Sequence, residues 1–75
     1  MLTNQKYTPE RLLDRIKKDN QLSTDSQLCD FLGIKSSVVS RVRNKRYGMS
    51  AELIIRIHDI SGMPIRTIKE IAGIE

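Results

Sequence analysis

A short helix with clear signals at both ends occupies the middle of the chain. The segment Thr24-Asp25-Ser26-Gln27 marks its start, because it has the form of a capping box. Leu22 and Leu28 flank this box and are placed to pack on each other as a hydrophobic staple. Gly33 marks its end, since glycine readily ends helices in the left-handed conformation. These signals predict a helix of only about two turns over residues 25–32.

A second helix begins only a few residues after Gly33. The segment Lys35-Ser36-Ser37 can open it and Asn44 can end it, which predicts a helix over residues 36–44. Two helices joined by so short a turn must cross steeply, so the second is held out from the body of the domain. Its apolar positions are Val38, Val39 and Val42, of which Val38 faces either the core or solvent.

The segment Thr8-Pro9-Glu10 predicts a helix on the N-terminal side of this pair. Thr8 suits the capping position, proline suits the first helical position, and Glu10 complements the positive end of the helix dipole. The predicted helix covers residues 9–19, and its apolar stripe consists of Leu12, Leu13 and Ile16.

Two further helices are predicted on the C-terminal side. Ser50 caps a helix over 51–61 that Gly62 ends, and Met63-Pro64 precedes a helix over 65–72. Their apolar residues recur every three or four positions, which favours helices over strands. These residues are Leu53, Ile54, Ile57 and Ile60, then Ile65, Ile68, Ile71 and Ala72. The chain is therefore predicted to be an all-α, five-helix domain over residues 8–75, preceded by a flexible segment over residues 1–7.

The length of 75 residues limits what this domain can do. A domain of this size buries only about 60% of the surface of its unfolded chain, which leaves little of it to wall a substrate pocket. Its residues assemble no nucleophile–base pair, so an enzyme is the least supported class. The single Cys29, expected as a small buried hydrophobe, excludes an intramolecular disulfide. The single His58 is expected at the surface, and no metal or cofactor is predicted.

The sequence shows no signal for a membrane. Apolar runs such as Leu53-Ile54-Ile55 are far shorter than the ~20 residues of a transmembrane helix. Residues 1–6 lack the apolar core of a signal peptide. We therefore expect a reduced, cytoplasmic protein with no membrane partner.

Positive charge is concentrated in one segment. Residues 35–47 contain five basic residues and no acidic one. Because the whole chain carries +4, its other residues together sum to −1. A run of charges alone is a solvated surface about as often as it is a binding surface. This run, however, coincides with the second helix of the closely joined pair. A local basic patch of this kind favours nucleic-acid binding.

The pair of helices resembles the helix-turn-helix of the phage repressor/Cro family of DNA-binding domains. The resemblance is carried by Gln27-Leu28-Cys29-Asp30-Phe31-Leu32-Gly33-Ile34 and by Val39-Ser40-Arg41-Val42-Arg43-Asn44. The family usually has alanine where Cys29 stands, and it often has a phosphate-contacting glutamine where Asp25 stands. The order of the five predicted helices extends the resemblance over residues 9–72 and implies a compact repressor-like bundle.

The resemblance implies that the helix over residues 36–44 enters the major groove of DNA, where each base pair presents a distinct pattern of donors and acceptors. The residues expected to face base edges are Lys35, Ser36, Ser37, Ser40 and Arg41. Arg41 is the best candidate for a bidentate contact with guanine, and a phosphate contact or an ion pair with Asp30 is its alternative. Val38 would meet a thymine methyl group if it faces outward.

The resemblance assigns other residues to the DNA backbone. Backbone N–H groups at the starts of the helices 25–32 and 51–61 would hold phosphates. The residues expected to contact the DNA backbone are Thr24, Gln27, Arg43, Asn44, Lys45, Arg46, Tyr47 and Ser50. For Tyr47, packing against its own loop is an equal alternative.

The expected function is that of a sequence-specific regulator of transcription that binds double-stranded DNA, and the resemblance implies a repressor. No small-molecule ligand is expected. One small domain makes few phosphate contacts, so we expect a homodimer that binds two half-sites ~10 bp apart. The candidate dimer surface consists of Ile65, Ile68, Ile71 and Ile74.

Two other functions compete with this one. An antitoxin-like protein-interaction module would use the same basic surface to dock an acidic partner. A protein that binds structured RNA is the second, but the deep, narrow major groove of A-form RNA excludes a helix that reads bases.

Overall fold

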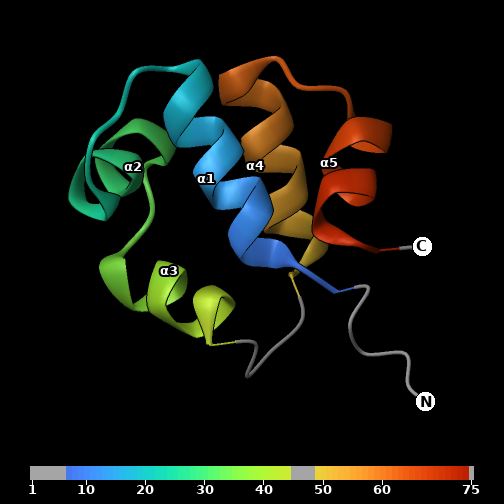
Figure 1. Ribbon diagram of the computed structural model, residues 1–75, viewed down its shortest axis with the longest axis horizontal. Helices are drawn as coiled ribbons and strands as arrows, with labels where there is room; N and C mark the ends of the chain where they lie inside the picture. The colour runs from blue at the N-terminus through green and yellow to red at the C-terminus, as the bar shows by residue number, and fades with distance from the viewer. Residues whose placement is uncertain (1–6, 45–48, 75) are drawn as a thin grey trace.

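The computed structural model describes residues 7–44 and 49–74. In chain order its helices are α1 (Pro9–Asp19), α2 (Asp25–Leu32), α3 (Ser36–Arg43), α4 (Ala51–Ser61) and α5 (Ile65–Ala72) (Figure 1). The all-α, five-helix prediction is confirmed. The one difference in bounds is that α3 ends at Arg43, with Asn44 as its C-cap. The flexible segment predicted over residues 1–7 lies outside the described residues, apart from Tyr7.

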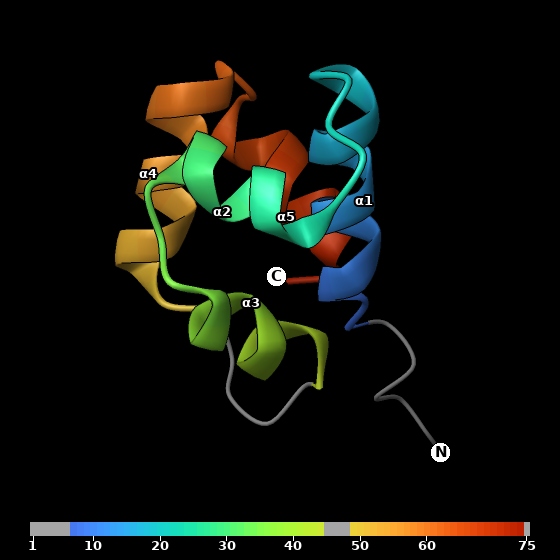
Figure 2. The same cartoon turned by 90° about the vertical axis from the view of Figure 1, so that its left-hand side faces the viewer.

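Helix α3 lies at one end of the molecule, whereas α1, α4 and α5 pack side by side and α2 runs across them (Figures 1 and 2). Helix α5 packs on α1 and α4, and α2 packs on α1 and α4 as well. Helix α3 contacts α1 and α2. Of the described helices, none is long and apolar enough to cross a membrane. The arrangement leaves one side of α3 open to its surroundings.

The ends of α4 form as the local sequence predicts. The Ser50 hydroxyl accepts the Leu53 N–H at 3.1 Å, which satisfies one of the free donors of the first turn. At the other end, Gly62 adopts the left-handed conformation. Pro9 opens α1, also as predicted.

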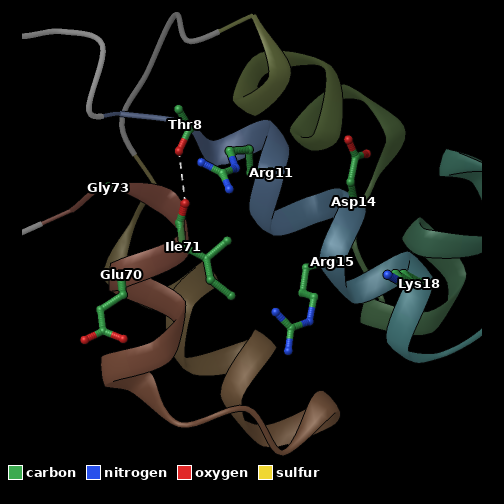
Figure 3. A pocket seen from close by; sticks show the side chains of 8 residues that line it. All are labelled: Thr8, Arg11, Asp14, Arg15, Lys18, Glu70, Ile71 and Gly73. Carbon is green, nitrogen blue, oxygen red and sulfur yellow. Dashed lines mark hydrogen bonds between the residues drawn. The ribbon is translucent and has the colours of Figure 1, made fainter.

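Thr8 occupies the N-cap position of α1, as predicted, but its side chain forms no capping hydrogen bond with the first turn. Its hydroxyl donates to the Ile71 carbonyl at 3.0 Å (Figure 3), and its N–H donates to the Ala72 carbonyl at 2.8 Å. The last carbonyls of α5 have no partner within their own helix, so they can accept both donors. Thr8 therefore ties the start of α1 to the end of α5.

The core is formed by one side of each helix. Leu12, Leu13 and Ile16 of α1 are almost completely buried. The other buried apolar residues are Leu28, Cys29, Leu32, Val39, Val42, Leu53, Ile57, Ile68 and Ala72. Two residues of the predicted stripes are exceptions, because Ile60 and Ile65 are each 41% exposed. Both lie near the connection between α4 and α5, at the edge of the core.

Candidate nucleic-acid interface

The capping box predicted at the start of α2 is complete. The Thr24 hydroxyl accepts the Gln27 N–H at 3.1 Å, and Gln27 Oε1 accepts the N–H groups of Ser23 and Thr24. Both predicted backbone-contact residues, Thr24 and Gln27, are exposed. Their side-chain oxygens already fix the helix end, so the Gln27 amide nitrogen is the group suited to donate outward.

The turn between α2 and α3 depends on Gly33. This residue has φ +68° and ψ +37°, in the left-handed region that side-chain-bearing residues rarely adopt. The next N–H, that of Ile34, donates to the Cys29 carbonyl at 3.0 Å and closes the end of α2. Helix α3 begins at Ser36, so only a short turn separates the two helices.

A residue of α4 completes this turn. Arg56 Nη1 donates to the carbonyl of Leu32, the last residue of α2, at 3.4 Å. The same nitrogen would lie 3.3 Å from a β-carbon added at Gly33. The sequence gives no signal for Arg56, because this contact joins residues 24 positions apart and no spacing within one helix reveals it.

Two buried valines attach α3 to the core. Val39 and Val42 are 3% and 5% exposed. Val38, whose direction the sequence left open, is half-buried and packs against the core. The valines on the inward side make the apolar contacts of α3 with the core. Its opposite side contributes no residue to the core.

That opposite side consists of the residues predicted to face base edges. Lys35, Ser36, Ser37, Ser40 and Arg41 are all exposed. Residues three and four apart share a face of a helix, so the three serines and Arg41 lie along one surface. Arg41 Nε donates to the Ser37 carbonyl at 3.4 Å. The ion pairs between described residues do not include one between Arg41 and Asp30.

The other residues predicted to contact the DNA backbone lie around this surface. Ser50 is exposed at the start of α4, and Asn44 is exposed at the end of α3. Asn44 Nδ2 donates to Ser40 Oγ at 3.4 Å. The remaining predicted contacts, Lys45, Arg46 and Tyr47, lie outside the described residues.

Arg43, also predicted to contact the backbone, is held by two carboxylates. Its Nε and Nη2 atoms each lie 2.8 Å from an oxygen of Asp25, and Nη2 lies 3.0 Å from Asp14 Oδ1. Lys17 Nζ reaches the same Asp25 carboxylate at 3.1 Å. The hydrogen bonds from Arg43 lower the pKa of Asp25, and the Asp25 carboxylate raises the pKa of Arg43. The cluster joins α1, α2 and α3.

Residues 11–70 match the family described as the bacteriophage CI repressor helix-turn-helix domain. The chain belongs to this family. No curated protein and no solved structure matches it. The matched range reaches from α1 into α5, so membership covers the whole bundle rather than the pair α2 and α3 alone.

Cys29 and His58 of this CI repressor domain contribute to its packing and helix contacts. Cys29 is 7% exposed, as the sequence predicts, and burial raises the pKa of its thiol. His58 is half-buried rather than a surface residue, and its Nδ1 lies 2.8 Å from the Met63 carbonyl oxygen. This contact connects the end of α4 with the approach to α5.

A second group of cations lies on α1, in an open groove beside α5 (Figure 3). Arg11, Arg15 and Lys18 line the groove together with Glu70 of α5. Arg15 pairs with Asp19 at 2.9 Å within the same helix. The sequence did not single out this group, because acidic residues lie among the basic ones and residues 9–19 carry a net charge of only +1.

Proposed function

We propose that this CI repressor domain binds double-stranded DNA with α3 in the major groove and represses transcription by occupying an operator. The observation that supports it best is the division of α3 into a buried side with Val39 and Val42 and an exposed polar side. A helix fits the major groove, and its exposed donors can match the pattern of each base pair. The base-facing set is Lys35, Ser36, Ser37, Ser40 and Arg41.

Residues around α3 hold the DNA backbone in this proposal. Thr24 and Ser50 lie at the starts of α2 and α4, where helix N-termini favour phosphates. Gln27 and Asn44 add neutral hydrogen bonds. Arg43, Lys45, Arg46 and Tyr47 complete the set of phosphate contacts, and these contacts orient α3 without reading sequence.

The protein binds as a homodimer in this proposal. Of the candidate dimer surface, Ile65 is exposed, and Ile71 and Ile74 are half-buried. Ile68 does not belong to it, because this residue is fully buried in the core. Ile65→Asp changes the exposed member of this surface, so it should leave the fold intact and weaken self-association, measured by sedimentation equilibrium. An unchanged association constant would remove this surface from the proposal.

A pair of arginine variants tests the division between base and backbone contacts. Arg41→Ala should relax base preference at one position in each half-site, at a cost of roughly 1–3 kcal/mol for the preferred base. Arg46→Ala should weaken binding to all sequences similarly and lower the slope of log affinity against log salt by about one unit. Both are measured by titration of operator and mutated duplexes. Identical behaviour of the two variants would contradict the division.

The salt slope of the wild-type protein also tests the competing function. Neutralisation of several phosphates gives a steep slope, whereas docking of an acidic protein on the same surface gives a weaker one. A wild-type protein that binds no duplex at low salt would contradict the proposal and favour a protein partner.

A further inference from the structure

The side chain of Arg43 is held more firmly than that of an ordinary surface arginine. Two parallel hydrogen bonds of 2.8 Å join it to Asp25, which is the bidentate geometry that fixes a guanidinium in one plane. Its side chain is 27% exposed, although it belongs to the last turn of a helix that lies at one end of the molecule. Asp25 is the first residue of α2, so the pair connects the two helices of the helix-turn-helix.

The donors of this guanidinium are not all used. Arginine has five N–H donors. Asp25 takes one from Nε and one from Nη2, and Asp14 takes the other from Nη2. The two donors of Nη1 take part in none of the hydrogen bonds between described residues. Nη1 and Nη2 form the outer edge of the guanidinium. Among the described residues, Asp14 occupies only the Nη2 side of this outer edge.

The two carboxylates hold Arg43 unequally. Asp25 makes two hydrogen bonds and is 41% exposed, whereas Asp14 makes one and is 63% exposed. Ion pairs between exposed groups contribute little, so Asp14 is the partner that is more easily replaced. A phosphate that replaces Asp14 would find the bidentate edge that arginine offers to phosphates.

We propose that Asp25 is a positioning residue for DNA binding, which holds Arg43 so that its outer edge binds a backbone phosphate in place of Asp14. This inference rests on the proposed function. It also explains how a carboxylate can stand at the start of α2, where the family often has a phosphate-contacting glutamine. The phosphate contact is moved from α2 to an arginine of α3, and Asp25 fixes the direction of that arginine.

The inference predicts an effect opposite to that of simple electrostatics. A carboxylate beside DNA repels phosphates, so its neutralisation ordinarily tightens binding. Asp25→Asn should instead weaken binding, by roughly three- to tenfold, because it releases a charge-assisted hydrogen bond to phosphate. Asp30→Asn is the matched control. Asp30 lies on the same helix, lines a groove beside α3 together with Asp25 and Arg43, and forms none of the ion pairs between described residues.

The probe is a labelled DNA duplex of mixed sequence, about three helical turns long. Affinities of the full chain are measured between about 50 and 200 mM salt, where phosphate contacts dominate. Circular dichroism at the same temperature confirms that each variant is folded. Asp25→Glu keeps the charge, so it should recover part of the affinity and provides a second measurement if Asp25→Asn does not fold.

A double-mutant cycle shows whether Asp25 acts through Arg43. Arg43→Ala should weaken binding at least as much as Asp25→Asn. In the Arg43→Ala background, Asp25→Asn should no longer weaken binding and should tighten it, as Asp30→Asn does. Asp14→Asn should bind as tightly as the wild type or more tightly, because it removes the competitor of the phosphate.

The outcomes separate this inference from the proposed function. A wild-type protein that binds the duplex, with an Asp25→Asn variant that binds as tightly or more tightly, would overturn the positioning role alone. The same follows if Asp25→Asn weakens binding equally with and without Arg43. Failure of the folded wild-type protein to bind any duplex would overturn the proposed function, and this inference with it.

Discussion

Helices α1 and α3 differ in how much apolar side chain they bury. In α1, Leu12, Leu13 and Ile16 are almost completely buried, and Thr8 ties the start of the helix to α5. In α3, Val39 and Val42 are buried and most of the other residues are exposed. Large apolar side chains supply most of the free energy of burial, so α1 contributes far more to stability than α3 does.

This difference shows why a small domain can carry a variable surface. The contacts of α3 with the core depend on the buried Val39 and Val42, on the half-buried Val38 and on the Arg43 cluster. The exposed side of α3 can therefore change without loss of the fold. The buried residues of α1, α4 and α5 cannot. We expect substitutions in the two regions to separate stability from binding.

The largest effect on stability is expected from a buried residue outside α3. Ile57→Ala should lower the free energy of unfolding by about 2–5 kcal/mol, because Ile57 is fully buried and its loss leaves a cavity. Arg41→Ala is the control on α3 and should change stability by about 0.5 kcal/mol or less. Urea unfolding followed by circular dichroism measures both. Equal losses from the two variants would contradict the division between the buried core and the exposed side of α3.

A smaller effect is expected in the turn that joins the two regions. Gly33→Ala should cost about 1–2 kcal/mol, because a β-carbon is strained at positive φ. Gly62→Ala is the matched control, since Gly62 has a similar φ and open space around its Cα. A β-carbon at Gly33 also approaches Arg56, so Gly33→Ala should lose more stability and weaken DNA binding. Gly62→Ala should bind DNA as the wild type does. If Gly33→Ala does so too, the turn does not set the direction of α3.

The smallest effect is expected from the pair of Asp25 and Arg43. Asp25→Asn should lower the free energy of unfolding at pH 7 by about 1 kcal/mol or less, because both side chains are partly exposed. The folded state lowers the pKa of Asp25, so the stabilisation is complete above its ordinary pKa of about 4. It is lost as the pH falls through the lowered pKa.

The difference in stability between the wild type and Asp25→Asn should therefore be constant from pH 7 to about 5 and shrink below about pH 4. Urea unfolding at a series of pH values measures it. A difference that is unchanged in strong acid would show that the variant acts through something other than the carboxylate charge.

The fold was largely predictable because its signals are local. Gly33, Gly62 and the capping box over Thr24–Gln27 act within one turn of helix, and they appear in the structure as the sequence indicates. The errors concern contacts between distant parts of the chain. The Thr8 hydroxyl donates to the Ile71 carbonyl at the end of α5, a partner 63 positions away that no local pattern reveals.

The candidate interface was predictable in part for the same reason. The exposed residues of α3 follow from helical periodicity, so Ser36, Ser40 and Arg41 could be named from the sequence. The contacts of Arg43 with Asp25 and Asp14 could not, because they join residues 18 and 29 positions apart. The contact of Arg56 with the turn has the same origin. Charge counting along the chain treats such residues as independent, whereas the fold pairs them.

The central claim, that α3 reads DNA sequence, is tested most directly by selection of bound duplexes from a random DNA pool. The selection is made at low and at physiological salt, with Arg41→Ala in parallel. The proposal predicts a two-fold symmetric motif for the wild type at both salt concentrations, and a motif that loses preference at one position per half-site for the variant. Recovery of binding that is salt-sensitive and independent of sequence would contradict it.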